Sequence, residues 1–335
     1  MNLEKNTSIS TKREYVNKQN SVGLNKDRLI YLVCMLVLAV IPLFMGNYTL
    51  HILILSLIFA ILALSWNLVV GYSGIFSFGH HAFFGIGAYV SAILSMKAGV
   101  SPWLGLIIAG VIAAIAGAFI GLPVLRLKAA PYIAILTLGF AEIVNLLISN
   151  LVDLTRGELG LSGIPQFTSI GPLAFNLANR INVYYLALII LALTIFVTTR
   201  LIKGPRGLAL KSIRESQEAA ESLGVNLTRN KLYVFTFSSF IAGVTGALFA
   251  HYVQVLTPSS VIGIDIMMEI LVITVIGGLG TILGPVVGSF IVILGLEYLR
   301  FLGDYRLIIY GVVLVLVIMF MPDGIMKRIF PKAKI

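Results

Sequence analysis

Charged residues are scarce in this chain of 335 residues. Only 11% of the residues are charged, whereas 59% are hydrophobic, and the mean hydropathy is +1.00. Soluble globular domains carry about 25% charged residues. A chain this apolar is poorly suited to a water-exposed surface, and the composition therefore indicates an integral membrane protein.

Cysteine is almost absent, since Cys34 is the only one. A single thiol excludes an intramolecular disulfide framework and any cysteine-rich metal site. His80 and His81 do not suggest a metal site either, because adjacent side chains on a helix point about 100° apart and no cysteine or carboxylate lies near them in the sequence. We therefore predict no metal site and favour interfacial or hydrogen-bonded histidines.

The chain also lacks the Gly-x-x-x-x-Gly-Lys-Ser/Thr loop that binds nucleotide phosphates, so we expect it not to hydrolyse ATP and to have no cofactor of its own. An intramembrane enzyme would need a nucleophile–base pair, a metal cluster or paired carboxylates that face a cavity. Here the acidic residues within apolar segments are scattered. The sequence therefore argues against an enzyme.

Apolar segments fill most of the chain. Ten of them lie roughly at 29–46, 50–70, 73–96, 102–125, 130–152, 183–202, 232–255, 266–279, 283–300 and 306–322. A straight helix needs about 20 residues to cross about 30 Å of hydrocarbon. The predicted fold is an all-α, polytopic transmembrane bundle of about ten spans in one domain, residues 29–325. Segment 266–279 is too short for a straight crossing, so we expect a short or broken helix buried by its neighbours.

Lysines and arginines predict the orientation, because they collect on the cytoplasmic side. Residues 1–28 read as a disordered, basic cytoplasmic tail before an uncleaved first span. Further basic clusters follow spans four, six and ten, and all of them then fall inside, including the basic tail 326–335. Both termini are predicted to be cytoplasmic. The net charge of +10 reflects this orientation, and no nucleic-acid partner is expected.

Five spans per half is an odd number, so the two halves would have opposite orientations, as in inverted-repeat transporters. An inverted repeat of five plus five spans is a hypothesis that rests on this count. The longest external connector is 153–182. Docking of a partner and an ordinary connecting role are both open for it.

Residues 67–89 interrupt the apolar pattern with glycines and hydroxyl groups at a span junction. Such a segment predicts a broken helix, which persists at membrane depth only where protein or a water-filled path surrounds it. Two interpretations stay open: a polar route lined by its freed backbone groups, or a tight interfacial turn. Glu142 lies near the middle of the fifth predicted span, 130–152. Its carboxylate should face the bundle interior or water, either as a pore or gate residue or as a protonated or paired structural glutamate.

Two sets of candidate residues follow from these breaks. The candidate translocation path comprises Asn67, Gly71, Ser73, Gly74, Ser77, Gly79, Thr137, Glu142 and Asn145. A second candidate broken-helix region comprises Gly277, Gly278, Gly280, Gly284 and Pro285. A stripe of small residues at helical spacing, by contrast, mainly predicts close helix packing. This stripe comprises Ala109, Ala113, Gly117 and Gly121.

The cytoplasmic loop 203–231 is a charged helix–glycine–helix element between apolar spans. Residues 206–223 suit a short amphipathic helix that buries Leu208, Ile213 and Leu223, with Gly224 as a left-handed stop and Thr228 as the following cap. Its shape suits a groove on a soluble partner. The candidate coupling residues are Arg214, Glu218, Ala219, Ala220 and Gly224.

Several motifs occur in a characteristic order at 64–80, 136–143, 160–165, 218–224, 277–285 and 310–324. Through them the chain, from about residue 30 onward, resembles the LivM-type permease subunits of branched-chain amino-acid ABC importers. The resemblance implies that Glu218 to Gly224 is the loop that engages an ATPase. One departure from the family is 155–157, which is poorer in glycine and bears on docking at the external connector.

The resemblance also implies a heteromeric importer in the bacterial cytoplasmic (inner) membrane. Its expected partners are a LivH-type sister permease, two ATPase subunits that bind ATP and magnesium, and an extracytoplasmic solute-binding protein. The same broad family includes permeases for urea and short-chain amides, which are the alternative solutes. An ion-coupled carrier or channel is the alternative from a different class, because of Glu142.

The orientation predicts which residues a membrane-impermeant thiol reagent reaches in intact cells. In a chain that lacks Cys34, Glu221→Cys should stay unlabelled until the cells are permeabilised, whereas Glu158→Cys in the external connector should label at once. Mass shift on a gel measures both. Labelling of Glu221→Cys from outside would reverse the predicted topology.

Overall fold

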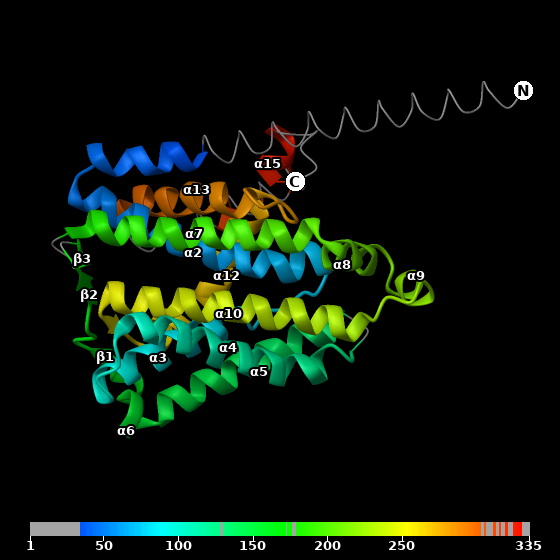
Figure 1. Ribbon diagram of the computed structural model, residues 1–335, viewed down its shortest axis with the longest axis horizontal. Coiled ribbons are helices and arrows are strands. Elements are labelled where there is room, and N and C mark those ends of the chain that lie inside the picture. Colours follow the sequence, from blue (N-terminus) through cyan, green and yellow to red (C-terminus); the bar gives the residue numbers. More distant parts are fainter. Residues whose placement is uncertain are drawn as a thin grey trace, which may run out of the picture.

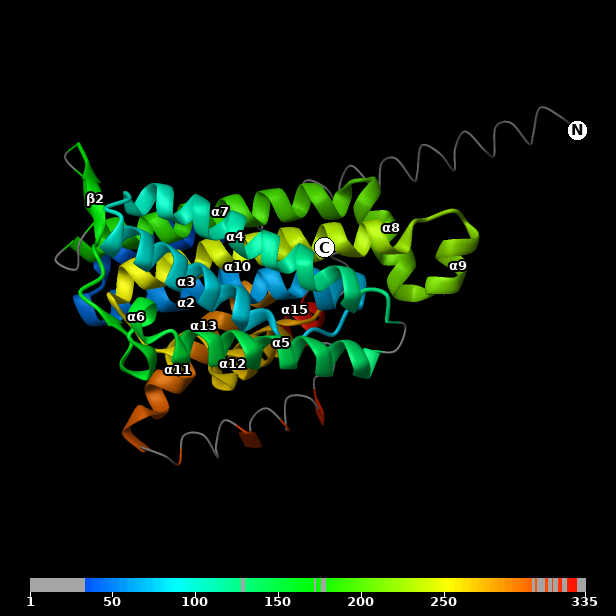
Figure 2. The same cartoon turned by 90° about the horizontal axis from the view of Figure 1, so that it is seen from below.

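The computed structural model describes residues 34–127, 130–171, 173–175, 179–302, 305, 311–312, 315, 319–320 and 324–329. The predicted tail 1–28 lies outside the described residues, as do most of the predicted span 306–322 and of the tail 326–335. The described part is a bundle whose long helices run along one common direction (Figures 1 and 2).

Helices dominate the order of elements. They are η1 Ile41–Phe44, α2 Asn47–Asn67, η2 Leu68–Tyr72, α3 His80–Lys97, α4 Pro102–Val124, α5 Ala130–Asn150, α6 Val152–Thr155, η3 Gly157–Leu159, α7 Arg180–Lys203, α8 Pro205–Glu215, α9 Gln217–Ser222, α10 Leu227–Val253, α11 Pro258–Ile262, α12 Ile264–Gly277, α13 Gly284–Tyr298, η5 Leu299–Leu302 and α15 Gly324–Ile329. The short strands are β1 Leu161–Ser162, β2 Phe167–Ile170, β3 Leu173–Phe175 and β4 Val255–Leu256.

Seven helical segments among the described residues are long and apolar enough to cross a membrane. They are Asn47–Tyr72, Pro102–Val124, Pro131–Asn150, Arg180–Lys203, Leu227–Val253, Pro258–Gly277 and Gly284–Phe301. Each overlaps a predicted span. The all-α class of a multi-pass bundle is therefore confirmed in its coarse form. The shorter apolar helix Cys34–Phe44 and the 18-residue helix α3 correspond to two further predicted segments.

Two predicted boundaries are wrong. The span expected at 73–96 becomes helical only at His80, because residues 73–79 are irregular. The segment expected at 266–279 begins earlier, since α11 and α12 together form the apolar segment Pro258–Gly277 of 20 residues, with a break at Gly263. Helix α11 therefore adds the length that 266–279 lacks for a crossing. The start of α11 is capped by Thr257 and Ser260.

Helix α2 occupies the centre of the bundle. In its apolar window 94% of the residues are buried, and it packs against α7, α10, α12 and α13. A helix that is hydrophobic all round is expected in such a buried position. The remaining helices surround α2, with α3, α4 and α5 on one side of the bundle in Figure 1.

Small residues bring α3, α4 and α10 close together. The predicted stripe on α4 is buried, and Gly117 lies against Ser239 of α10. Two turns further along α10, Gly246 lies against the backbone carbonyl of Phe84 in α3 so closely that a Cβ atom there would collide with it. Because lipid supplies no hydrophobic drive for helix association, such close backbone contact is what holds these helices together.

The two ends of the bundle differ. One end carries the strands and α6, and the other carries α8 and α9 (Figure 1). The connector 153–182 contains strands β1, β2 and β3, which the sequence did not predict. Strand β1 pairs antiparallel with β4, which follows α10, and β2 pairs antiparallel with β3. His251 of α10 holds the connector down, because its ring nitrogens bond Ser91 Oγ at 2.8 Å and the carbonyl oxygen of Pro165 at 2.7 Å.

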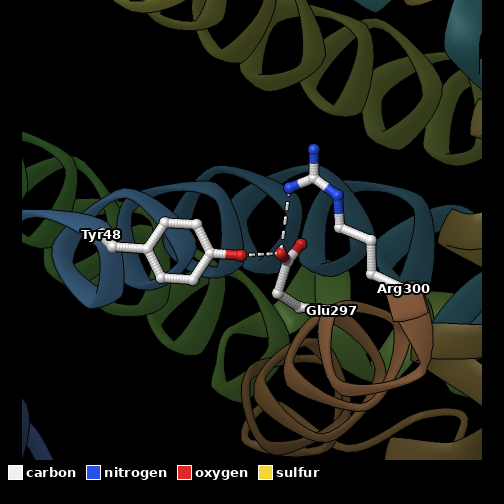
Figure 3. Close-up of polar contacts among 3 residues, drawn as sticks. All are labelled: Tyr48, Glu297 and Arg300. Carbon is white, nitrogen blue, oxygen red and sulfur yellow. Dashed lines mark hydrogen bonds and ion pairs between the residues drawn. The ribbon is translucent and has the colours of Figure 1, made fainter.

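A polar cluster links α2 to the end of α13 at the strand-bearing end. The Tyr48 hydroxyl donates a hydrogen bond to the Glu297 carboxylate, and Arg300 Nη1 lies 3.1 Å from the same carboxylate (Figure 3). These side chains are largely exposed, so the ion pair contributes only about 0–1 kcal/mol.

The packing predicts that alanine has opposite effects on stability at two helical glycines. Gly246→Ala should destabilise the protein by about 1–3 kcal/mol, because the added methyl group collides with α3. Gly295→Ala is the matched control: nothing lies within 4 Å of its added Cβ, and alanine favours the helix by about 0.5–1 kcal/mol. Thermal unfolding in detergent measures both. Equal shifts would contradict the close contact of α3 and α10.

Candidate functional site

The first helix break follows α2. The helix widens into the π-helical turn Leu68–Tyr72, and residues 73–79 leave helical geometry altogether. Gly74 adopts φ +70°, a conformation that favours glycine. The carbonyl of Val69 accepts hydrogen bonds from the Ser73 hydroxyl at 2.5 Å and from the amide of Ile75 at 3.2 Å. The residues here are mostly buried, so the segment is enclosed by protein, as a break at membrane depth requires.

The second break lies between α12 and α13, where the sequence placed its other broken-helix region. Gly278 and Gly280 have φ of +118° and +75°. The Thr281 hydroxyl donates to the carbonyl of Gly278 at 2.7 Å and accepts from the amide of Gly284 at 3.1 Å. Pro285 then occupies the first turn of α13, where its missing N–H costs nothing.

The Asn67 side chain joins the two breaks. Its Oδ1 accepts a hydrogen bond from the amide of Gly280 at 2.8 Å, and its Nδ2 donates to the carbonyl of Thr281 at 2.6 Å. One fully buried amide thus satisfies two backbone groups that the second break leaves open. The chains approach closely here, since a Cβ atom on Gly71 would lie 2.6 Å from the nitrogen of Gly280.

Arg214 of α8 reaches the same place from the loop between α7 and α10. Its guanidinium donates to the carbonyl of Gly71. A Cβ atom on Gly74 would lie 3.4 Å from Arg214 Cγ, and one on Gly280 would lie 2.9 Å from Arg214 Nη1. The arginine therefore touches both breaks. We name this set, Asn67, Gly71, Gly74, Gly280 and Arg214, the break junction.

The remaining candidates of the first break lie beside the junction and are buried. Trp66 Nε1 donates to the carbonyl of Ser77 at 2.7 Å, while the Ser77 hydroxyl has no hydrogen-bond partner. Gly79 lies against the carbonyl of Thr137 in α5, and the amide of Phe78 donates to Thr137 Oγ1 at 2.9 Å. These contacts fix α5 to the first break.

Glu142 and Asn145 do not join this group. Of the two surroundings expected for Glu142, the bundle interior or water, the described chain does not provide the first, because the side chain is exposed on the outer face of α5. The physical reason is the pattern of α5, whose opposite face carries the residues that pack inward. Asn145 lies one turn later, half-buried, and its Oδ1 is buried without a hydrogen-bond partner.

The loop expected to hold one helix over 206–223 holds two. Helix α8 ends at Glu215, and Ser216 starts α9 by accepting a hydrogen bond from the amide of Ala219 at 3.3 Å. Of the residues predicted to be buried, Ile213 is buried whereas Leu208 and Leu223 are 67% and 81% exposed.

The other features of this loop also lie at defined places. Gly224 adopts φ +81° where α9 ends, as expected for a left-handed stop. Asn226, rather than Thr228, caps α10 by accepting from the amide of Arg229 at 2.9 Å. Within the candidate coupling loop, Glu218, Ala219 and Gly224 are exposed, whereas Ala220 is buried.

Helices α8 and α9 are anchored on α10 by contacts that the sequence did not reveal. The Arg206 guanidinium lies over the Tyr233 ring at 3.9 Å, and Lys231 Nζ donates to Gln217 Oε1 at 2.9 Å. Both pairs are separated by more than ten residues, so helical spacing gives no signal for them. Together with Arg214, they connect the loop to α10 and to the break junction at once.

A hollow of about 860 Å³ opens beside α9, between the end of α4 and the start of α10. Its lining is Leu125, Arg126, Leu127, Ser216, Gln217, Glu218, Glu221, Gly224, Val225, Asn226, Leu227, Thr228 and Lys231. Both charge signs are present, which suits a polar protein surface. In the described part of the chain, no group of three or more His, Cys, Asp or Glu residues could hold a metal ion.

Comparison with known proteins decides the family. The profile of the family described as "Branched-chain amino acid transport system / permease component" matches residues 48–318. The chain belongs to this permease family. No solved structure matches it.

Named relatives of this permease come from bacteria and an archaeon. The high-affinity branched-chain amino acid transport system permease protein LivM of Escherichia coli K12 is 35% identical over 93% of this chain and 78% of its own length. The corresponding LivH protein of Salmonella typhimurium is 29% identical over 81% of this chain and 91% of its own. A probable LivM of Methanocaldococcus jannaschii is 23% identical over 81% and 91%, respectively.

The side-chain amide of Asn67 should contribute strongly to the stability of this permease, because it holds the break junction together. Asn67→Ala leaves the amide of Gly280 and the carbonyl of Thr281 without partners, and each lost bond costs about 1–3 kcal/mol. We expect a clearly lower thermal midpoint in detergent.

The control is Asn150→Ala. Asn150 is exposed and bonds only the carbonyl of Leu146 in its own helix, at 2.7 Å, so the change should stay within about 0.5 kcal/mol. A drop of equal size in both variants would mean that Asn67 does not hold the two breaks together.

Proposed function

We propose that this permease is one of two membrane subunits of an ATP-driven importer of branched-chain amino acids in the bacterial cytoplasmic membrane. The family match and the names of the LivM and LivH relatives support the solute class. The contact of Arg214 with the break junction carries the mechanism, because it links the loop suited to a motor protein to the interrupted helices of the bundle.

The assembly follows from this role. The partners are a LivH-type sister permease, two ATPase subunits that bind ATP and magnesium, and an extracytoplasmic solute-binding protein. This permease contributes no nucleotide site. We place ten spans in it, with both termini and loop 203–231 in the cytoplasm, and two halves of five spans in opposite orientation. The position of α8 and α9 at the end of the bundle opposite the strands supports one part of this proposal, that loop 203–231 and the connector 153–182 lie on opposite sides of the membrane (Figure 1).

The coupling element is the pair α8–α9 with its exposed tip. Leu223 is 81% exposed at that tip, next to Gly224 and the hollow beside α9. The ATPase subunit binds here, and its closure on ATP moves α8 and α9 relative to the membrane.

Motion passes inward through Arg214. A displacement of α8 breaks or shifts the hydrogen bond to Gly71, and the two helix breaks, which Asn67 joins, respond as one unit. Breaks are suited to this task because their backbone bonds to a few side chains and can exchange partners, whereas a regular helix resists bending. Alternating access then arises from tilting of α2, α3, α12 and α13 around the junction.

If Arg214 and Gly224 couple the ATPase to the bundle, two variants should separate ATP hydrolysis from uptake. The assay uses the purified complex of both permease subunits and both ATPase subunits together with the solute-binding protein. Arg214→Ala removes a charged hydrogen bond worth about 1.5–3 kcal/mol, so uptake of leucine should fall about tenfold or more while ATP hydrolysis continues. Gly224→Val forces a β-branched residue into φ +81°, which misplaces the tip and should act in the same direction.

Lys211→Ala is the control, since it removes an exposed positive charge from the same helix and should leave both rates unchanged. Full uptake in Arg214→Ala would exclude the junction as the coupling route. Competition of leucine uptake by isoleucine, valine and urea, in the same assay, identifies the solute class, and uptake without ATP would instead favour an ion-coupled carrier.

A further inference from the structure

Helix α5 is the least buried of the seven long apolar segments. Only 22% of its window is buried, whereas the other six range from 39% to 94%. It packs mainly against α3, α4 and α11 and lies at the edge of the bundle (Figure 2). Within the described part of the chain, no element covers the rest of its surface.

The two faces of α5 have different partners. One face is buried and comprises Ile133, Thr137, Ala141, Val144 and Ile148. The opposite face is exposed and comprises Ile135, Gly139, Glu142, Ile143 and Leu146, which recur every three or four residues. We call this second set the α5 outer face.

The α5 outer face is chemically unlike the faces that suit lipid. On α7 the large exposed side chains within the span are apolar, as at Ile189, Leu193 and Phe196. The exposed face of α5, by contrast, carries a carboxylate within the span, that of Glu142. An ionised side chain is costly in hydrocarbon and normally faces a partner or a water-filled cavity. Lipid is therefore an unsuitable neighbour for this part of α5.

Gly139 adds a second feature to the same face. It lies one turn before Glu142, and nothing comes within 4 Å of the position of a Cβ atom there. The missing side chain leaves the space beside the carboxylate open, and the neighbouring side chains of Ile135 and Ile143 on the same face are apolar. A negative charge beside open space, with apolar side chains on the same face, complements an ammonium group that carries an aliphatic side chain.

We propose that the α5 outer face is the wall that this subunit contributes to the translocation pathway, that a second permease subunit of the same family closes it, and that Glu142 meets the ammonium group of the amino acid in transit. The inference rests on the proposed import function. The LivH relative, which is 29% identical over 81% of this chain and 91% of its own length, provides a partner of similar sequence.

The position of α5 also connects this wall to the break junction. Thr137, on the buried face of the same helix, accepts a hydrogen bond from the amide of Phe78 and borders Gly79. The outer face begins two residues earlier, at Ile135. A shift of the first break therefore moves the wall directly, without passing through the central helix.

Paired cysteines test which medium covers the face. Leu146 on α5 and Leu193 on α7 are both 59% exposed in the single chain, so Leu146→Cys and Leu193→Cys are matched, each in a Cys34→Ser background within the assembled transporter. A small hydrophilic methanethiosulfonate reagent should modify Leu146→Cys at least about tenfold faster than Leu193→Cys, and a saturating leucine concentration should slow only the former.

A lipid-soluble maleimide, by contrast, should modify Leu193→Cys faster than Leu146→Cys. Equal rates at the two positions, or a Leu146→Cys that resists both reagents, would overturn the proposal, since the face would then lie in lipid or in a dry interface. Glu142→Gln adds a functional readout: leucine uptake should need at least about tenfold more leucine for half-maximal rate, and Glu142→Asp should restore most of it.

These results separate the two proposals. If the unmodified complex fails to import leucine on ATP, the proposed function fails, whatever the labelling shows. If it imports leucine but Leu146→Cys behaves like Leu193→Cys and Glu142→Gln transports normally, only the assignment of the α5 outer face fails.

Discussion

The structure depends on one buried amide. Both helix breaks free backbone groups that are largely buried within the bundle, and a buried polar group without a partner costs free energy. Asn67 offers an acceptor and a donor on a planar group, and it uses both, on the amide of Gly280 and the carbonyl of Thr281. A hydrophobic side chain could provide neither bond. The absence of a side chain at Gly71 is what lets the two segments come close enough.

Other features gain their meaning from this junction. Arg214 enters it from the α8–α9 loop, and Arg206 and Lys231 hold that loop on α10. On the other side, Thr137 links the first break to α5. In the proposed mechanism, the long, regular helices move as rigid units, and their relative positions change at the short irregular segments. Glycine serves two separate purposes here: it allows close contact between α3, α4 and α10, and it allows backbone conformations with positive φ at the breaks.

Much of this arrangement could be read from local patterns. The apolar segments are visible because hydrocarbon imposes a minimum length, and the Ala109 to Gly121 stripe indicated a packed face. Glycines at 71–79 and 277–284 indicated where helices break. Errors came where a pattern allowed two outcomes: residues 206–223 became two helices because Ser216 caps the second, and the segment expected at 266–279 gained α11 in front of it.

The sequence alone indicated a multi-pass membrane protein, which segments are apolar and long enough to cross a membrane, where the helices are interrupted and that a charged loop divides the chain. These properties depend on solvent, on residue periodicity and on local backbone freedom. Only the tertiary structure decided that Asn67 bonds Gly280, 213 residues away, that Arg214 contacts Gly71, and that Glu142 points out of the bundle. The reason is that each of these depends on how whole helices pack and rotate against one another, and the residues next to them in the chain carry no record of that choice.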